Sequence, residues 1–527
     1  MAESLMDALR AYDKTCYPLH MPGHKRRLDP SGGLPISIDI TEVDGMDDLH
    51  NASGILAEAE ARTAALYGSP CCRYLVGGNT VGILSAIRAC CSRNGTVLAA
   101  RNCHKSVWHA AELMNLTTAF LMPERIGTFD LFGSVRPEEV AGKLRKHPEA
   151  EAVVITSPTY EGILSDVRAI AAICHAAGVP LIVDEAHGAH LGLQVGNFSD
   201  REFFPQGAVS CGADVVIQSA HKTLPCLTQT SWMHIQGNLV SAKRVDHELD
   251  VFETSSPSYP LMVSLDAATG FLTREGGDYM HRWEEYLTAF TEKTRGLRRL
   301  WIPGVTDPLP QTAAFARDPG KILISGKGAG MTGEALAAIL RDQYQFETEM
   351  AVGWNVLAMT SMADDPEEIK RFAEVLSEID SDSLNKTEPS ARECITAADI
   401  DIEIEARADA EFSAAATDPG QTDLAAAPPA ETVMTIAEAM ERPSVPVTEE
   451  SAAGAVSAEY LWAYPPGVPL IMPGERITDG LLCTLRVLRA AGTAIHHEGR
   501  AHDSVQDGMI LTVKAEKEDP KKEQNRI

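Results

Sequence analysis

Polar side chains that can take part in chemistry follow several short apolar runs of the sequence. A lysine is part of Ser219-Ala220-His221-Lys222-Thr223, an acid begins Asp184-Glu185-Ala186-His187, and Gly77-Gly78-Asn79-Thr80 and Arg101-Asn102-Cys103-His104 follow two other runs. A lysine can act as an amine nucleophile, and a carboxylate can hold a proton or a cation. A glycine pair that opens a helix can bind an anion through free backbone N–H groups. Together these residue types indicate a site for a small charged molecule.

The elements that must position these residues are short strands that alternate with amphipathic helices. Apolar residues recur at helical spacing over 83–91 and over 167–177, between runs rich in β-branched residues. This alternation is typical of βαβ units with a mainly parallel sheet, in which ligands bind beyond the carboxyl ends of the strands. The predicted strands are Arg73–Val76, Thr96–Ala99, Ala152–Thr156, Leu181–Val183 and Asp214–Gln218. The sequence therefore predicts that the polar segments meet at one rim of an α/β sheet.

The residue types at this rim fit the cofactor pyridoxal phosphate (PLP). This cofactor needs a lysine for its imine, a carboxylate that keeps its pyridine nitrogen protonated, and donors for its phosphate. Each feature alone also has a simpler interpretation. A glycine pair is often a plain turn, a lysine a solvated surface residue, and an aspartate after a strand a helix cap. The order of the features along the chain favours the cofactor site.

Four segments of the chain together resemble the ornithine/lysine/arginine decarboxylase family. They are Met21-Pro22-Gly23-His24-Lys25, Arg101-Asn102-Cys103-His104-Lys105-Ser106, Ser219-Ala220-His221-Lys222-Thr223-Leu224-Pro225 and Tyr464-Pro465-Pro466-Gly467-Val468-Pro469-Leu470. The resemblance implies a fold-type-I PLP-dependent enzyme, similar to aspartate aminotransferase. Such an enzyme has a mainly parallel large domain and a smaller α+β C-terminal domain. Asp184-Glu185-Ala186-His187 resembles the short, Gram-positive-type members of the family.

The family's functional residues carry over onto matching positions of this sequence. The resemblance implies that Lys222 carries the cofactor and that Asp184 pairs with the pyridine nitrogen. It also implies that His104 stacks on the ring and that His187 lies near the phenolic oxygen, which completes the catalytic set. The other predicted cofactor-binding residues, near the phosphate or the imine, are Asn79, Thr80, Ser219 and His221.

The resemblance also implies the reaction, which is loss of the α-carboxylate of arginine, lysine or ornithine as CO2. The products would be agmatine, cadaverine or putrescine, which feed polyamine metabolism. Arginine is the preferred substrate here only because the short subgroup is often assigned to it. The distal cation of such a substrate needs a carboxylate partner, although a solvated acidic loop is an equally good interpretation of each candidate. The candidates are Glu42, Asp44, Asp47, Asp48 and Glu475.

Two other functions remain open from the sequence. Another fold-type-I PLP enzyme, such as an acyl-CoA-condensing synthase or an aminotransferase, would share the cofactor site but lacks the Arg101–Ser106 and Tyr464–Leu470 strings. Asp184-Glu185-Ala186-His187 also spells the DEAH box of nucleotide-driven motors, but no G-x-x-x-x-G-K-[ST] segment is present to bind a nucleotide. The motor is therefore a remote alternative.

Composition limits the partners and the location of the protein. The net charge of −28 opposes binding to nucleic acid, and no apolar stretch is long enough to span a membrane. The first residues do not resemble a secretion signal, so we expect a cytoplasmic protein. His187 and His190 lack a third ligand, so we expect no metal site. Fold-type-I enzymes usually build their site across a dimer interface, and by resemblance we expect a homodimer or a dimer-based assembly.

Composition also predicts where the domains of the chain begin and end. An acidic segment with alanine runs and prolines at 385–431 is predicted to be a linker or insertion. Before it we expect an N-terminal arm at 1–30, a PLP-binding large domain at 31–280 and the first part of a small α+β domain at 281–384. In that small domain, Lys321–Ser325 is predicted to be a strand and Gly333–Gln343 a helix. After the linker, 432–527 is predicted to continue the C-terminal domain.

Overall fold

A seven-stranded sheet forms the centre of the large domain. The computed structural model describes residues 4–15, 21–22, 25–195, 203–385, 430–463, 468–490, 495–498 and 508–514. In spatial order the strands are β1 (Cys71–Leu75), β10 (Ser231–Ile235), β9 (Val215–Gln218), β8 (Leu181–Asp184), β6 (Ala150–Thr156), β2 (Thr96–Ala100) and β3 (Thr117–Leu121). Strands from β9 to β3 pair in parallel, and β10 runs against both of its neighbours. The predicted mainly parallel α/β sheet is confirmed, with each predicted strand within two residues of its observed bounds.

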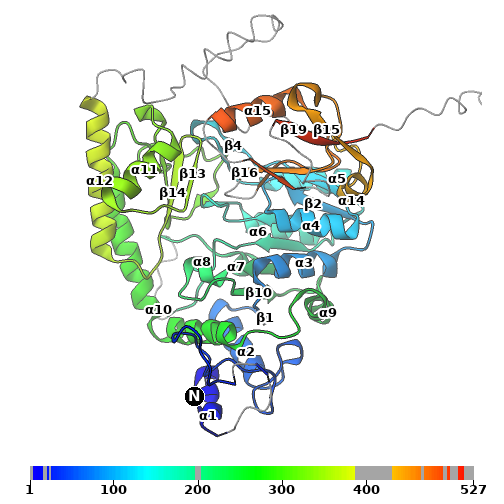
Figure 1. Cartoon of the computed structure of the whole chain (residues 1–527), viewed down its shortest axis with the longest axis vertical. Coiled ribbons are helices and arrows are strands. Elements are labelled where there is room, and N and C mark those ends of the chain that lie inside the picture. The colour runs from blue at the N-terminus through cyan, green and yellow to red at the C-terminus, as the bar shows by residue number, and fades with distance from the viewer. Residues whose placement is uncertain are drawn as a thin grey trace, which may run out of the picture.

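Helices cover both faces of this sheet (Figure 1). Crossovers through α3 and α4 move along the sheet toward β3, whereas those through α5, α6 and α7 move back, so right-handed connections put the two groups on opposite faces. α3 packs against α4 and α9, and α6 packs against α5 and α7. Their bounds are α3 (Gly78–Cys90), α4 (Lys105–Met114), α5 (Pro137–Lys146), α6 (Val167–Ala176), α7 (Ala208–Cys211) and α9 (Ala242–Phe252).

A glycine pair joins β1 to α3 at the carboxyl edge of the sheet. A Cβ atom on Gly77 would lie 2.5 Å from Cγ2 of Val81 and 2.8 Å from Oε1 of Glu253, which is closer than packed atoms tolerate. Gly78 has a φ of +78°, in the left-handed region that side chains disfavour. The turn therefore requires glycine at both positions, and it places the start of α3 at the rim that the sequence predicts.

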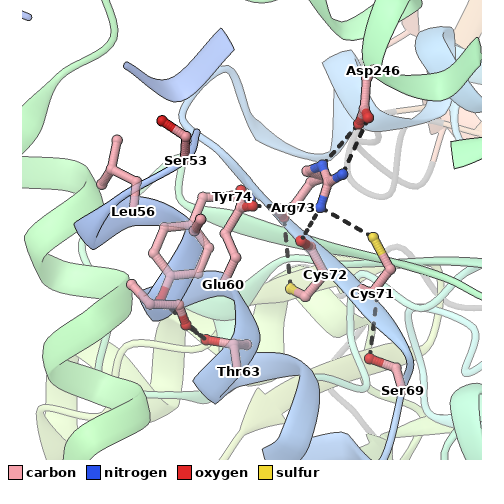
Figure 2. A network of polar contacts seen from close by, with 12 residues as sticks. Ser53, Leu56, Glu60, Thr63, Ser69, Cys71, Cys72, Arg73, Tyr74 and Asp246 are labelled. Carbon is pink, nitrogen blue, oxygen red and sulfur yellow. Dashed lines mark hydrogen bonds and ion pairs between the residues drawn. The ribbon is translucent and has the colours of Figure 1, made fainter. Parts of the chain in front are cut away.

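A partly buried polar network holds β1 between α2 (Ile55–Tyr67) and α9 (Figure 2). Nε and Nη2 of Arg73 donate to the carboxylate of Asp246 in α9, at 2.8 and 3.1 Å. From α2, Oε1 of Glu60 accepts the backbone N–H of Tyr74 at 2.9 Å. Burial raises the pKa of Glu60 to about 7, even though the nearby Arg73 guanidinium acts in the opposite direction. This network fixes the strand from which the glycine turn starts.

A long helix, α10 (Tyr259–Thr294), connects the large sheet to a small α+β unit (Figure 1). The unit has a three-stranded antiparallel sheet in the order β12 (Lys321–Ser325), β14 (Asn355–Met359) and β13 (Met350–Val352). Two helices belong to it, α11 (Gly333–Tyr344) and α12 (Pro366–Asn385). The predicted strand at 321–325 is β12, and the predicted helix at 333–343 is α11, which ends one residue later.

The last described part of the chain forms sheets of its own beside α4 and α5 (Figure 1). β15 (Ser444–Thr448) pairs with β19 (Met509–Val513), and β16 (Tyr460–Ala463) pairs with β17 (Val468–Ile471) and β18 (Ile495–Glu498). Its helices are α14 (Ile436–Glu441), which packs on α4, and α15 (Asp479–Ala490). Within the described ranges these strands do not extend the β12–β14–β13 sheet. The predicted linker falls largely on 386–429, outside the described residues, and the division into domains remains a prediction.

The other described elements are short or peripheral. They are α1 (Leu5–Thr15), α8 (Ala220–Thr223), β4 (Arg125–Ile126), β5 (Leu131–Phe132), β7 (Ile163–Leu164) and β11 (Ala316–Arg317), with 3-10 turns at 49–51, 127–129, 327–329 and 449–451. Among the described helices, none combines the length and the apolar character that a membrane crossing requires.

Candidate active site

The predicted cofactor residues line one cavity of about 620 Å³ at the carboxyl edge of the large sheet. This volume is in the usual range for cofactor pockets. The structure brings together these eight residues, which lie at the ends of four separate strands. Those that line the cavity are Asn79, Thr80, His104, Asp184, His187, Ser219, His221 and Lys222.

Asp184 provides a buried carboxylate at the end of β8. Its side chain is almost inaccessible to solvent, and Oδ1 accepts hydrogen bonds from Nδ2 of Asn79 at 3.0 Å and from the N–H of Ala186 at 3.1 Å. Burial raises the pKa of Asp184, although the Lys222 charge and these hydrogen bonds favour ionisation. A carboxylate in this setting gains from a cationic or N–H partner inside the cavity.

Lys222 lies on α8, the single helical turn that follows β9. It is accessible from the cavity, and its Nζ is 2.9 Å from Nε2 of His187. Desolvation by the surrounding protein lowers the pKa of Lys222, and the charges of Asp184 and Glu349 oppose this shift. A lowered pKa increases the fraction of neutral amine, the form that reacts with an aldehyde.

Two further histidines present defined ring nitrogens to the cavity. Nδ1 of His104 accepts the N–H of Ser106 at 3.3 Å at the start of α4, and burial, together with the Lys222 and Lys105 charges, lowers the pKa of His104 to about 4. Its ring is therefore neutral at physiological pH. Nδ1 of His221 bonds to the carbonyl of Thr230 at 2.8 Å, and a carbonyl can only accept, so Nδ1 carries the proton. This leaves Nε2 of His221 as an acceptor.

The start of α3 supplies donors for an anion. Within the part of the chain that the structure describes, no side chain caps this helix, and its first turn, which includes Asn79 and Thr80, lies at the cavity. The preceding N–H groups of Val76 and Gly77 are already bonded to Oε2 of Glu253, at 3.1 and 3.0 Å. The first-turn N–H groups and the helix dipole thus remain available to a phosphate.

The carboxylates predicted to bind the distal cation lie elsewhere in this chain. Among the described residues, none of the five lines the cavity. Asp47 caps α2, accepting the N–H groups of Ser53, Gly54 and Leu56 at 2.8 to 3.0 Å. Asp48 caps the turn at 49–51, and Glu42 accepts a hydrogen bond from Thr41. Asp44 lies at the surface, and Glu475 forms an ion pair with Arg101. Their role as substrate ligands remains a prediction.

Sequence reasoning missed several charged residues at the site. Asp130, Glu161 and Glu349 line the cavity, and Lys321 lies buried behind His187 with its Nζ 2.7 Å from Nδ1. Glu161 follows β6 in the polar segment Ser157–Gly162, which the strand-end rule also selects, but sequence reasoning assigned it no role. Lys321 opens an apolar strand, and a lysine there is an unusual feature that could have been noticed. Asp130 and Glu349 come from irregular segments that carry no comparable signal.

The described residues contain no cluster of side chains suited to hold a metal ion. The chemistry of the cavity comes from a lysine, a buried carboxylate, neutral imidazoles and a helix start. Such a combination on a mainly parallel sheet has the residue types that a PLP-dependent α/β enzyme needs.

Comparisons with known proteins agree with this class. The structure of the lysine decarboxylase LdcF of Francisella novicida matches with a TM-score of 0.76 and 19% identity, covering 97% of this chain and 81% of that one. The constitutive lysine decarboxylase of E. coli matches with a TM-score of 0.73 and 23% identity, covering 97% and 82%. These likenesses concern the fold.

The sequence itself defines the family. The model of the Orn/Lys/Arg decarboxylase major domain matches residues 5–301, and that of the C-terminal domain matches residues 421–497. An arginine decarboxylase of Halalkalibacterium halodurans is 30% identical over 90% of this chain and 91% of its own length. YaaO of Bacillus subtilis is 33% identical over 88% and 89%. The chain belongs to the Orn/Lys/Arg decarboxylase family, which confirms the predicted family and the predicted enzyme class.

These findings support decarboxylation of a basic amino acid and, through the family and the fold, the use of PLP. They do not distinguish arginine from lysine, because relatives with both names match. A further example is the constitutive lysine decarboxylase of E. coli, which is 26% identical over 88% of this chain and 73% of its own length.

Proposed function

We propose that this protein is a PLP-dependent arginine decarboxylase that converts arginine to CO2 and agmatine. The observation that carries the proposal is the convergence of Lys222, Asp184 and the start of α3 on one cavity. The choice of arginine is supported by relatives named arginine decarboxylase that align with most of the chain, including one of Bacillus anthracis at 28% identity. Lysine and ornithine are the other candidate substrates.

The residues present fit the cofactor. Among the described residues, buried polar atoms near the cavity lack hydrogen-bond partners within the protein, and these include Oδ1 of Asn79 and Oγ1 of Thr156. Oδ1 of Asp184 accepts both of that side chain's hydrogen bonds from the described protein. Unpaired buried polar groups are costly, so a polar ligand that reaches them is favoured. We propose that Lys222 holds the cofactor, that Asp184 faces its pyridine nitrogen, and that Asn79, Thr80, Ser219 and His221 surround its phosphate and imine.

When bound, PLP supplies the electron sink that accepts the electron pair left by the departing carboxylate. The chain's own residues hold protons and orient groups. Asp184 keeps a proton on the nitrogen that it faces, because its buried carboxylate is stabilised by a positive partner. His104 remains a neutral flat ring that can stack without adding charge. The neutral amine of Lys222 is suited to exchange with the substrate amine.

Acidic residues of the cavity support a cationic substrate. Asp130, Glu161 and Glu349 line it together with Asp184, and Tyr160 donates a hydrogen bond to Glu349. A guanidinium forms paired hydrogen bonds with carboxylates, whereas an ammonium acts as a point charge. These three carboxylates join the five predicted from the sequence as candidates for the distal cation.

We further propose a homodimer or dimer-based assembly, a cytoplasmic location and a role in polyamine metabolism. The same proposal divides the chain into the N-terminal arm, large domain, small domain, linker and C-terminal domain at the predicted boundaries. The family supports these statements, and separately the net charge of −28 opposes nucleic acid as a partner. Light scattering of the purified protein measures the assembly directly.

The test of function is a substrate panel. Purified protein with PLP is given arginine, lysine or ornithine, and released CO2 and amine are both measured. We expect CO2 and agmatine from arginine in equal amounts and much slower reaction of the other two. Cadaverine or putrescine as the main product would move the assignment to lysine or ornithine. A requirement for an acyl-CoA or a keto acid would instead show another fold-type-I enzyme.

A further inference from the structure

His187 lies between two lysines, one of which belongs to the proposed cofactor site. Its Nε2 is 2.9 Å from Nζ of Lys222, and its Nδ1 is 2.7 Å from Nζ of Lys321. His187 is 4% exposed and Lys321 is 1% exposed. Lys321 is the first residue of β12, in the small α+β unit, so this contact crosses from the small sheet to the large one.

The two hydrogen bonds limit where protons can lie on Lys222, His187 and Lys321. A neutral imidazole has one N–H donor and one acceptor nitrogen, whereas an ammonium group has donors only. Burial and the charges of Lys321 and Lys222 hold the pKa of His187 well below its ordinary value, so the ring is neutral. If both hydrogen bonds are present, at most one lysine can be an ammonium. The lysine that is charged determines which ring nitrogen carries the proton.

Acidic groups interact with the Lys321 amine, and both its ammonium and its neutral form can donate a hydrogen bond to Nδ1 of His187. Asp318 lies on the loop before β12, and it is fully buried and in contact with His190 at 3.2 Å. Burial lowers the pKa of Lys321 to about 7 and the Lys222 charge acts in the same direction, whereas the charges of Asp318, Glu349 and Glu161 oppose this shift. On β11, the guanidinium of Arg317 donates to the carbonyl of Lys321.

The Lys321 side chain passes close to the backbone of Gly162. A Cβ atom on Gly162 would lie 2.7 Å from both Cβ and Cγ of Lys321. Gly162 also has a φ of +93°, a conformation that favours glycine. The loop after β6 therefore leaves room for this lysine to reach His187.

We propose that Lys321 is a positioning residue that donates to Nδ1 of His187 and so keeps the proton of the ring on Nε2, directed at Lys222. The proposal rests on the proposed function, in which Lys222 carries the cofactor. In the cofactor-free protein, the Nε2–H group donates to the lone pair of the Lys222 amine and keeps that amine neutral. The neutral amine attacks the aldehyde carbon of PLP, an N–C bond forms, and the aldehyde oxygen leaves as water. Lys321 thus prepares Lys222 without touching the cofactor or the substrate.

The test follows the capture of PLP by the cofactor-free full-length protein between about pH 6 and pH 9, as the rise of visible absorbance. In Lys321→Met the proton is no longer held on Nε2, so Lys222 can donate to His187 as an ammonium. We expect the pH midpoint of the capture rate to rise by about one unit, which makes capture about tenfold slower at pH 7. A purely structural loss would lower the extent of binding without moving this midpoint.

Two other variants complete the experiment. Lys327→Met removes a lysine that follows the same strand but does not line the cavity, and we expect it to match the wild type. Lys321→Arg keeps a side chain that only donates, and we expect it to retain capture at neutral pH. A Lys321→Met profile equal to the wild type, or a Lys321→Arg profile equal to that of Lys321→Met, would overturn the proposal. If Lys321→Met does not fold, as judged by circular dichroism, loss of neutral-pH capture in Lys321→Arg overturns it.

The outcome also separates this proposal from the proposed function. If the wild type gains no visible absorbance with PLP, the proposed function fails and this proposal fails with it. If the wild type captures PLP on Lys222 and the Lys321 variants do not differ from it, only the positioning role of Lys321 is wrong.

Discussion

At the scale of single residues, the environment of Asp184 decides what the cavity can do. The carboxylate is buried at the end of a central strand and receives hydrogen bonds from Asn79 and Ala186. Such a group is suited to stabilise a positive charge in front of it, because burial makes its ionisation costly without a partner. In the proposed site that partner is the protonated pyridine nitrogen of PLP.

Replacing this carboxylate should separate cofactor binding from catalysis. For Asp184→Asn we expect PLP still to bind with visible absorbance, because Lys222 is intact, while kcat for decarboxylation falls at least about a hundredfold. Asp166→Asn is the matched control, since Asp166 caps α6 through a hydrogen bond to the N–H of Ala169 and asparagine caps equally well. Near-wild-type decarboxylation by Asp184→Asn would show that this carboxylate does not hold the essential proton.

The residues at strand ends could be predicted from the sequence because an apolar run fixes where a strand stops. Lys222 and Asp184 follow such runs and lie in the cavity. Lys321 could not be assigned a role, because its contact with His187 joins residues 134 positions apart and depends on how two sheets pack. The acidic residues near 42–48 were chosen by charge alone, and charge does not report which loop faces the cavity.

At the scale of elements, β1 is held by a partly exposed ion pair and a buried acid. Arg73 links this strand to α9 through Asp246, and Glu60 links it to α2 (Figure 2). Glu60 is 4% exposed, and burial raises its pKa to about 7 from an ordinary value of 4.5. The protonated acid is therefore the form that the folded protein prefers.

This shift makes a prediction for stability against pH. Between about pH 4.5 and 7 the folded protein binds a proton at Glu60 that the unfolded chain has lost, so this residue's contribution falls as the pH rises through that window. In Glu60→Gln the contribution no longer varies with pH. Relative to the wild type, we expect the unfolding free energy of Glu60→Gln to increase by a few kcal/mol between about pH 4.5 and pH 7.

Urea unfolding of both proteins at several pH values measures this difference. Glu58→Gln, on the same helix, is the control, and it should parallel the wild type. Parallel curves for Glu60→Gln and the wild type would contradict the raised pKa of Glu60.

Five strands of the large sheet could be predicted within two residues because they are short, continuous apolar runs, and α3 and α6 could be recognised because each buries one face at helical spacing. β3 and β10 were not among the predicted strands. The positions of the small sheets near the C-terminus could not be predicted, since their strands are short and pair across loops of very different length. The segment Tyr464–Leu470 was found by resemblance only. Of it, Val468, Pro469 and Leu470 line the cavity, and 464–467 lie outside the described residues.

At the scale of the whole molecule, a nearly buried ion pair between Arg101 and Glu475 helps to attach the C-terminal part to the large sheet. Arg101 follows β2 and donates to the carbonyls of Pro469 and Leu470, at 2.7 and 3.3 Å, and to Oε2 of Glu475 at 3.2 Å. Both side chains are nearly buried, and Oε2 of Glu475 also accepts the N–H of Met472 at 2.8 Å. The pair therefore places the segment that closes one wall of the cavity.

Breaking this pair from one side should be costly. In Arg101→Met the Glu475 carboxylate stays buried without its cation, and we expect a loss of about 3 kcal/mol or more in unfolding free energy. The double variant Arg101→Met with Glu475→Leu removes both charges and should recover part of that loss. Urea unfolding of the two single variants and the double variant gives the coupling. Additive losses would show that the two side chains do not stabilise each other.

The covalent attachment of PLP to Lys222 is the claim on which the rest of the account depends. Purified protein saturated with PLP is reduced with borohydride, digested, and mapped by mass spectrometry. We predict that the cofactor mass is found on the peptide that contains Lys222, and that Lys222→Ala carries none. Label on Lys321 or on another lysine, or no fixed label in the wild type, would contradict the account.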